Sequence, residues 1–236
     1  MRVWTTFAAA CALAIGTGGM VMAKDAPGAP PPRRFVEYLA PLKQADAWWL
    51  MGFYAVTFGG FVGLAASLPI YFTDRFGLTP VQAGYATAAC VFAGSLVRPM
   101  GGALADAIGG VKALMAVFIA AAMTLTGVAM VDGFAASLAL FVLSMLALGV
   151  GNGSVFQLVP QRFATEIGVM TGLVGMAGGI GGFYLASSLG LAKQWTGSFS
   201  SGFLIFAALA VVALAGLTLV KTRWRRTWGA AEGVRI

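Results

Sequence analysis

Long apolar stretches separated by short polar segments dominate the chain. A helix needs roughly 20 apolar residues to cross a hydrocarbon core about 30 Å thick. Seven stretches meet that length, in residues 4–22, 48–72, 83–105, 111–131, 136–160, 168–191 and 202–220. The short alternating segments typical of membrane β-strands are missing from the pattern. The sequence therefore predicts an all-α, polytopic membrane helix bundle with about seven transmembrane helices.

Composition supports this class, since 59% of the 236 residues are hydrophobic and 10% are charged. The net charge of +7 does not indicate a nucleic-acid partner, because the basic residues lie in short segments beside apolar stretches. One side of the predicted membrane carries Lys24, Arg33, Arg34, Lys43, Lys112, Arg162, Lys221, Arg223, Arg225, Arg226 and Arg235, and the other carries Arg2, Arg75 and Lys193. By the positive-inside rule we expect a protein of the inner (plasma) membrane, with its N-terminus outside and its C-terminus cytoplasmic.

Four segments organise the chain. Residues 1–23 predict a first transmembrane helix, although a cleavable signal peptide has similar features. Residues 24–46 read as a Pro-rich, basic cytoplasmic linker, and its charge favours a retained first helix. Residues 47–221 form a six-helix unit, with Asp46 expected as the N-cap of its first helix, and residues 222–236 form a basic cytoplasmic tail.

Arg98 stands alone inside the apolar stretch 83–105. An arginine at the centre of a membrane helix costs roughly 2.5–3.5 kcal/mol on insertion scales, so such residues face a partner or a watery cavity. The guanidinium group stays charged and presents a planar fork of donors, which suits a small planar oxyanion. The alternative is a structural arginine that pairs with a carboxylate or extends to the membrane surface.

Three further groups are candidates for the same site. Tyr54 and Phe58 share one helix face, where two rings can sandwich a flat anion, but ordinary packing gives the same spacing. Asn152 lies among glycines inside an apolar stretch, where it serves either a transport path or a hydrogen bond between helices. Gly178 and Gly179 belong to a glycine-rich stretch that favours tight packing and bending.

Residues 101–112 read as a short cytoplasmic turn between two helices. Gly102, Asp106, Gly109 and Lys112 make it a candidate gate, and an ordinary tight turn is the alternative. No cofactor or metal site is indicated, because the chain has no histidine and both Cys11 and Cys90 lie in apolar segments. The sequence also lacks a nucleophile–base pair, so we do not expect an enzyme.

With these residues in view, the chain resembles the nitrate/nitrite porter family of the major facilitator superfamily. Residues 102–112 resemble the superfamily's motif between the second and third helices of each six-helix half. Residues 57–63, 94–102, 149–153 and 178–183 resemble the porters' own motifs in their second half. Ala186 departs from the pattern, since a proline is expected there.

The resemblance implies a substrate and a site. Nitrate and nitrite bind in that family between two arginines, one from each half, with aromatic rings above and below the anion. Arg98 would be the second-half arginine, and Tyr54 and Phe58 would line the pocket. Members of the superfamily have twelve helices, and this chain resembles about the sixth to the twelfth of them. Three explanations for the missing first half remain: a separate polypeptide that supplies it, a homodimer of half-transporters, and a truncated reading frame. The odd helix count disfavours the homodimer.

The function expected is transport of nitrate and nitrite by alternating access. Arg98 would bind the anion, and the segment around Asp106 would act as the cytoplasmic gate. Every acidic residue lies in a loop or near a predicted helix end, so exchange is slightly favoured over proton symport. A competing interpretation is a membrane scaffold or assembly partner, in which Arg98 pairs with a lipid or another helix.

Overall fold

The computed structural model describes residues 39–230. The predicted helix in residues 1–23, most of the predicted linker and the end of the predicted tail lie outside the described residues. Within residues 39–230 the elements are helical throughout, and no strand occurs there. The prediction of an all-α membrane helix bundle is confirmed.

Six candidate membrane spans occur in the described part of the chain. The main helices are α3 (Ala45–Phe76), α4 (Pro80–Leu96), α5 (Arg98–Ile108), α6 (Gly110–Met130), α7 (Phe134–Arg162), α8 (Ile167–Thr196) and α9 (Ser200–Arg226), and the short ones are η1 (Ala40–Lys43), η2 (Ala164–Glu166) and η3 (Trp228–Ala230). Helices α4 and α5 together make one span. Helix α9 continues past Lys221 to Arg226, so the first part of the basic tail is helical.

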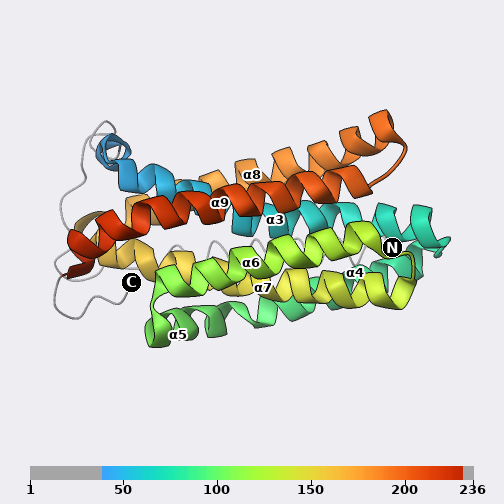
Figure 1. The fold of residues 1–236 in the computed structure, drawn as a ribbon, viewed down its shortest axis with the longest axis horizontal. Helices are drawn as coiled ribbons and strands as arrows, with labels where there is room; N and C mark the ends of the chain where they lie inside the picture. Colours follow the sequence, from blue (N-terminus) through green and yellow to red (C-terminus); the bar gives the residue numbers. More distant parts are fainter. Residues whose placement is uncertain (1–38, 231–236) are drawn as a thin grey trace, which may run out of the picture. The chain divides into compact units, whose positions relative to one another are not determined.

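The long helices run side by side (Figure 1). Helix α3 packs along α8, α9 packs along α6 and α8, and α7 lies against α3, α4, α5 and α6. Two apolar cores form along the bundle. One surrounds Tyr71, Phe141 and Phe203 near the α8–α9 turn, and the other surrounds Phe53 and Trp224 near the end of α9. We refer to these two ends as the α8–α9 end and the α9 C-terminal end.

Glycines let α3 and α8 approach closely. A Cβ atom on Gly59 would lie 2.7 Å from the backbone carbon of Gly181, and one on Gly63 would lie 2.9 Å from the Cβ of Leu185. A Cβ atom on Gly181 would lie 2.4 Å from the carbonyl oxygen of Ala55. Small residues are the usual means of close helix packing in membranes, where backbones must meet to gain contact. This helix pair holds the wall of the site described below.

The predicted membrane-spanning stretch 83–105 lies within one span, Pro80–Ile108, but the helix is interrupted inside it. A break at Val97 separates α4 from α5, with Arg98 as the first residue of α5 and Pro99 directly after it. Proline has no N–H to donate to the carbonyl four residues earlier, so the ladder is interrupted at that point. Proline is favoured in the first turn of a helix, and α5 therefore starts there.

The prediction that residues 101–112 form a turn is wrong. Helix α5 continues to Ile108 and α6 begins at Gly110, so Gly109 alone connects them. Gly109 has φ +96°, a backbone conformation that favours glycine. One such residue reverses the chain direction, and the segments on either side stay helical.

Asp46 is not an N-cap, because α3 begins at Ala45 with Gln44 in the cap position. Asp46 is buried, and its carboxylate accepts hydrogen bonds from the Nε of Arg162 at 2.6 Å and the Nε1 of Trp224 at 2.8 Å. Arg223 also pairs with it. We call these four residues the Asp46 cluster. It joins the ends of α3, α7 and α9.

Candidate functional site

Arg98 is half-buried at the break between α4 and α5. It precedes Ile108, the end of α5, by ten residues, or about 15 Å of helix. Its guanidinium carbon lies 4.4 Å from the centroid of the Phe61 ring and 5.3 Å from that of Phe58. The Nε atom is buried and has no hydrogen-bond partner among the described residues. The structure thus surrounds this cation with aromatic faces and leaves a buried donor unused.

Helix α3 supplies the aromatic wall. Phe61 belongs to the core at the α8–α9 end, and Phe58 packs against the core at the α9 C-terminal end, so Arg98 faces the level where the two cores meet. Gly94, four residues before Arg98, allows this contact: a Cβ atom there would lie 2.6 Å from Cε2 of Phe61. A cation over an aromatic face gains about 0.5–2 kcal/mol, less than the cost of its burial. A negatively charged ligand would offset the remainder.

The rings of Tyr54 and Phe58 stack directly on each other. Their centroids are 5.1 Å apart and their planes are within 4° of parallel. An anion between two rings would lie about 3.5 Å from each face, so the rings would have to be about 7 Å apart. The interpretation that a flat anion lies between these two rings is therefore wrong for this conformation. Phe156 of α7 meets Tyr54 edge to face at 4.9 Å and completes the wall.

The two candidate glycines of α8 lie in different surroundings. A Cβ atom on Gly178 would lie 2.6 Å from Cδ1 of Tyr54 and 2.8 Å from Cδ1 of Phe58. Gly178 is therefore the surface against which the stacked rings pack. Gly179 is exposed, and no atom lies within 4 Å of the place where its Cβ would be. The structure brings Gly178 to the aromatic wall and leaves Gly179 on the open side of the helix.

Asn152 is buried in α7, and both of its side-chain polar atoms lack a hydrogen-bond partner among the described residues. Thr57 of α3 is in the same condition: it is fully buried and its hydroxyl has no partner. The side chain of Thr57 packs against Gly151, the neighbour of Asn152. An unsatisfied buried polar group costs about 1–3 kcal/mol, so such groups call for a functional explanation or an ordered water.

Sequence reasoning missed Phe61, Phe156 and Thr57 as members of this site. Phe61 lies three residues after Phe58, a spacing that brings residues to the same side of a helix. Thr57 is a polar residue inside an apolar stretch, the signal that identified Asn152. Phe156 carries no such signal, since an aromatic residue in an apolar helix is ordinary packing.

Three of the four candidate gate residues lie at the α5–α6 turn, and Gly102 lies earlier in α5. Gly109 is the turn residue itself, and Asp106 and Lys112 are exposed on the last turn of α5 and the first turn of α6. Gly102 lies inside α5, where a Cβ atom would approach the carbonyl oxygen of Gly153 no closer than 3.9 Å. Gly101 is tighter, because a Cβ atom there would lie 2.3 Å from the carbonyl oxygen of Val150. The first half of α5 thus lies directly against α7 at Gly101.

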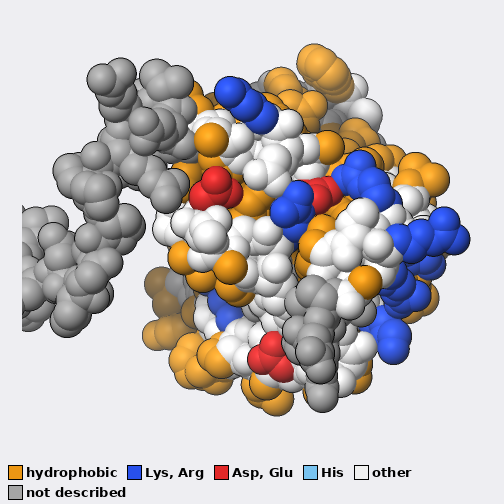
Figure 2. Space-filling model, turned by 90° about the vertical axis from the view of Figure 1, so that its left-hand side faces the viewer, with side chains coloured by type: hydrophobic (Ala, Val, Ile, Leu, Met, Phe, Trp, Pro, Cys, Tyr) orange, Lys and Arg blue, Asp and Glu red, His pale blue; other side chains and the backbone are white. Residues whose placement is uncertain are grey.

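The two ends of the bundle differ in charge. The α9 C-terminal end carries Lys43, Lys112, Arg162, Lys221, Arg223, Arg225 and Arg226, whereas the described basic residues of the α8–α9 end are Arg75 and Lys193. Figure 2 views the first of these ends, where Lys and Arg side chains gather on one side with carboxylates among them. The described residues contain no group of three or more His, Cys, Asp or Glu side chains placed to hold a metal ion.

Six apolar helices long enough to cross a membrane, with Arg98 away from both ends of one of them, define a polytopic membrane protein. Residues 3–186 match the family profile of the Major Facilitator Superfamily, and the chain belongs to that superfamily. Its similarity to the nitrate/nitrite porters, predicted from the motifs, is confirmed by its relatives.

Three relatives define the branch. The nitrite extrusion protein of Bacillus subtilis (strain 168) is 40% identical over 177 residues, which is 73% of this chain and 43% of that protein. A probable nitrate/nitrite antiporter of Thermus thermophilus, NarK1, is 34% identical over 77% of this chain and 45% of its own. A probable nitrate/nitrite transporter of Mycobacterium tuberculosis (strain H37Rv), NarK2, is 36% identical over 89% of this chain and 55% of its own. The chain spans about half the length of the curated relatives it matches.

Proposed function

We propose that this chain provides the second half of a nitrate/nitrite transporter that works by alternating access. The observation that carries the proposal is Arg98, a permanent cation with a buried, unpaired Nε, held against aromatic faces inside an apolar bundle. A planar oxyanion accepts parallel hydrogen bonds from a guanidinium group. The names of the relatives, which refer to nitrate or nitrite, supply the substrate.

In this proposal the anion binds Arg98 beside the stacked rings of Tyr54 and Phe58 and not between them. Gly178 sets the position of that pair from α8, and Asn152 offers an amide that donates to or accepts from the substrate or its water. Movement of α8 against α3 would then shift the rings relative to Arg98. That coupling gives the glycine contacts between α3 and α8 a role in transport.

Exchange of nitrate for nitrite suits the described residues better than proton symport. The described acidic residues, Asp46, Asp74, Asp106, Asp132 and Glu166, all lie at or near helix ends. A proton carrier coupled to the substrate is expected near the middle of the membrane. Proteoliposomes that contain the complete assembly and are loaded with nitrite should take up nitrate without a pH gradient. Nitrate uptake that requires an imposed pH gradient would contradict exchange.

The proposal includes a first half that supplies a second arginine, since the resemblance assigns that arginine to the first half. It also places the α9 C-terminal end in the cytoplasm, because that end carries most of the basic residues. Asp106, Gly109 and Lys112 at the α5–α6 turn, with Gly102 two turns earlier in α5, then lie towards the cytoplasmic side, where they gate access to Arg98.

Uptake of nitrate and nitrite by cells that lack their own porters tests the proposal. Three strains are compared. One expresses this chain alone, one expresses a polypeptide that supplies the first half alone, and one expresses both. Uptake is expected only when both are present. Uptake by the chain alone would contradict the need for a second arginine, and no uptake with both halves in the membrane would favour a scaffold.

A further inference from the structure

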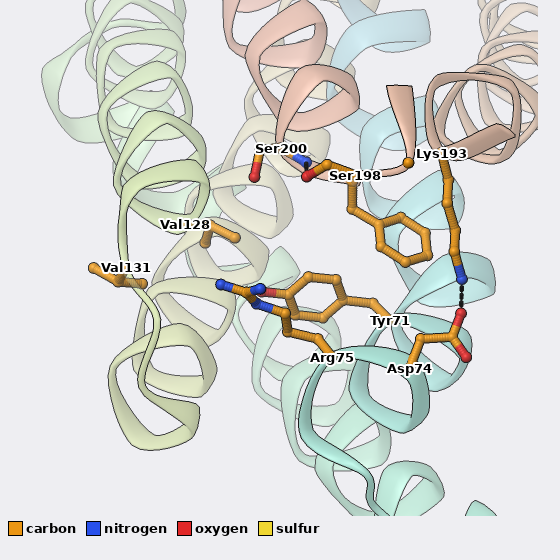
Figure 3. Close-up of a pocket in the computed structure, with 10 residues that line it drawn as sticks. Tyr71, Asp74, Arg75, Val128, Val131, Lys193, Ser198 and Ser200 are labelled. Carbon is orange, nitrogen blue, oxygen red and sulfur yellow. Dashed lines mark hydrogen bonds and ion pairs between the residues drawn. The ribbon is translucent and has the colours of Figure 1, made fainter. Parts of the chain in front are cut away.

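A polar cavity at the α8–α9 end lies apart from Arg98. Its volume is about 360 Å³, and its lining includes Tyr71, Arg75, Lys193 and the turn that leads into α9. Tyr71 is ten residues beyond Phe61 on α3, about 15 Å along the helix. Figure 3 shows Arg75 on one side of the cavity and Ser198 and Ser200 on the other, with Lys193 and Asp74 at its edge. Side chains from α3, α6, α8 and α9 therefore converge on one space.

The cations of this cavity retain unused donors. Arg75 pairs with Asp132, and Lys193 pairs with Asp74. The side chain of Asp132 is 89% exposed, so its pair with Arg75 adds little stability and yields readily to a competing anion. A guanidinium group has five N–H donors and an ammonium group three, more than these pairs use. The lining residues Arg75 and Lys193 face one carboxylate of the lining, Asp74, and the exposed Asp132 balances Arg75 until an incoming anion displaces it.

The start of α9 contributes a positive potential of its own. Helix α9 is 27 residues long, and its N-cap, Phe199, makes no side-chain capping bond. The backbone N–H of Ser200 donates to the Oγ of Ser198 at 3.1 Å, which shapes the turn at the cavity. Backbone N–H groups and the dipole at a helix N-terminus favour an anion. Phe199 also holds Lys193 in place, since the ammonium nitrogen lies 4.7 Å from its ring centroid.

We propose that this cavity binds a singly charged oxyanion, with Arg75 and Lys193 as donors and the start of α9 as a third contact. The chemistry fits two sources: a free inorganic anion such as nitrate, and the phosphodiester of a phospholipid headgroup at the membrane surface. The inference does not rest on the proposed transport function, because Arg98 takes no part in it.

Calorimetry and native mass spectrometry on the full chain in dodecyl maltoside test this site. The calorimetric titration uses the Arg98→Gln variant, which lacks the proposed site at Arg98. Binding of sodium nitrate to this variant therefore reports on the cavity. Phosphatidylglycerol added before mass spectrometry reports on the lipid source. We expect saturable binding of one or the other, weakened at least tenfold by Arg75→Gln with Lys193→Gln and unchanged by Arg225→Gln, an exposed cation at the opposite end. Binding of neither probe, or binding that the double substitution leaves unchanged, would overturn the proposal.

A second variant guards against misfolding of the double substitution. Ser200→Phe fills the cavity and leaves both cations in place, and circular dichroism checks its helix content. Loss of the same binding in a folded Ser200→Phe chain supports the site. Full binding in that variant overturns it, whatever the double substitution does.

Discussion

Arg98 and Phe61 lie face to face in the middle of the bundle, with the guanidinium carbon 4.4 Å from the ring centroid. Gly94 makes room for the ring on α4, and the break at Val97 directs the arginine toward it. The cation is held by aromatic faces instead of a carboxylate, since Arg98 forms no ion pair within residues 39–230. An arginine held in this way keeps donors for a ligand.

Replacing Gly178 by alanine should impair transport. The added Cβ would lie 2.6 Å from the Tyr54 ring and 2.8 Å from that of Phe58, so the stacked pair must move relative to Arg98. We expect uptake by the complete assembly to fall roughly tenfold, because small displacements at a binding site are costly. Gly175→Ala on the same helix is the matched control, since no atom lies within 4 Å of its Cβ position. Equal uptake by both variants would show that the ring position does not matter.

Asn152→Leu should separate binding from stability. The amide makes no hydrogen bond with the described residues, so its loss removes a desolvation cost of about 1–3 kcal/mol and breaks no bond. The variant should unfold at the same or a higher concentration of dodecyl sulfate than the wild type, and its nitrate uptake should fall. A clear loss of stability would instead assign Asn152 to helix packing.

Gly59→Ala should destabilise the contact between α3 and α8. Its Cβ would lie 2.7 Å from the backbone of Gly181, which cannot give way without moving the helix. Overpacking of this kind costs about 1–3 kcal/mol, measurable as the free energy of unfolding in dodecyl sulfate. Gly52→Ala, on the same helix with no atom within 4 Å, should be neutral or stabilise by up to about 1 kcal/mol. Similar values for the two variants would contradict the close approach.

Asp46→Asn should loosen the α9 C-terminal end. The substitution removes the charge that Arg162 and Arg223 share and replaces one acceptor oxygen by a donor. We expect a loss of about 2 kcal/mol in the free energy of unfolding, less than the roughly 3–5 kcal/mol for a fully buried ion pair, because Arg223 is half exposed. Glu166→Gln, which removes a carboxylate outside this cluster, serves as the control. An unchanged unfolding midpoint in Asp46→Asn would show that the cluster contributes nothing.

The membrane helices could be predicted from the sequence because their length and apolarity are local properties. Their interruptions were harder to predict. The break at Val97 depends on Pro99, whose effect on a long apolar stretch is a kink, a break or neither according to its neighbours. The α5–α6 connection needs only Gly109, and counting glycines between residues 101 and 112 cannot identify the one that takes positive φ.

The site itself was predictable only in part. Arg98 is conspicuous because a charge in an apolar stretch has few explanations. Phe156 and Thr57 join it through contacts between helices that are distant in sequence, and those contacts depend on how the glycines of α3, α7 and α8 let the backbones meet. The Asp46 cluster was missed for the same reason, since Arg162 and Trp224 follow Asp46 by 116 and 178 residues.

Nitrate uptake by the complete assembly carrying Arg98→Lys tests the central claim most directly. Lysine keeps the positive charge but presents a point charge in place of a planar fork of donors. With wild-type amounts of protein in the membrane, we predict uptake no higher than in cells without the chain. Uptake at the wild-type rate would show that Arg98 does not bind the transported anion and would contradict the account.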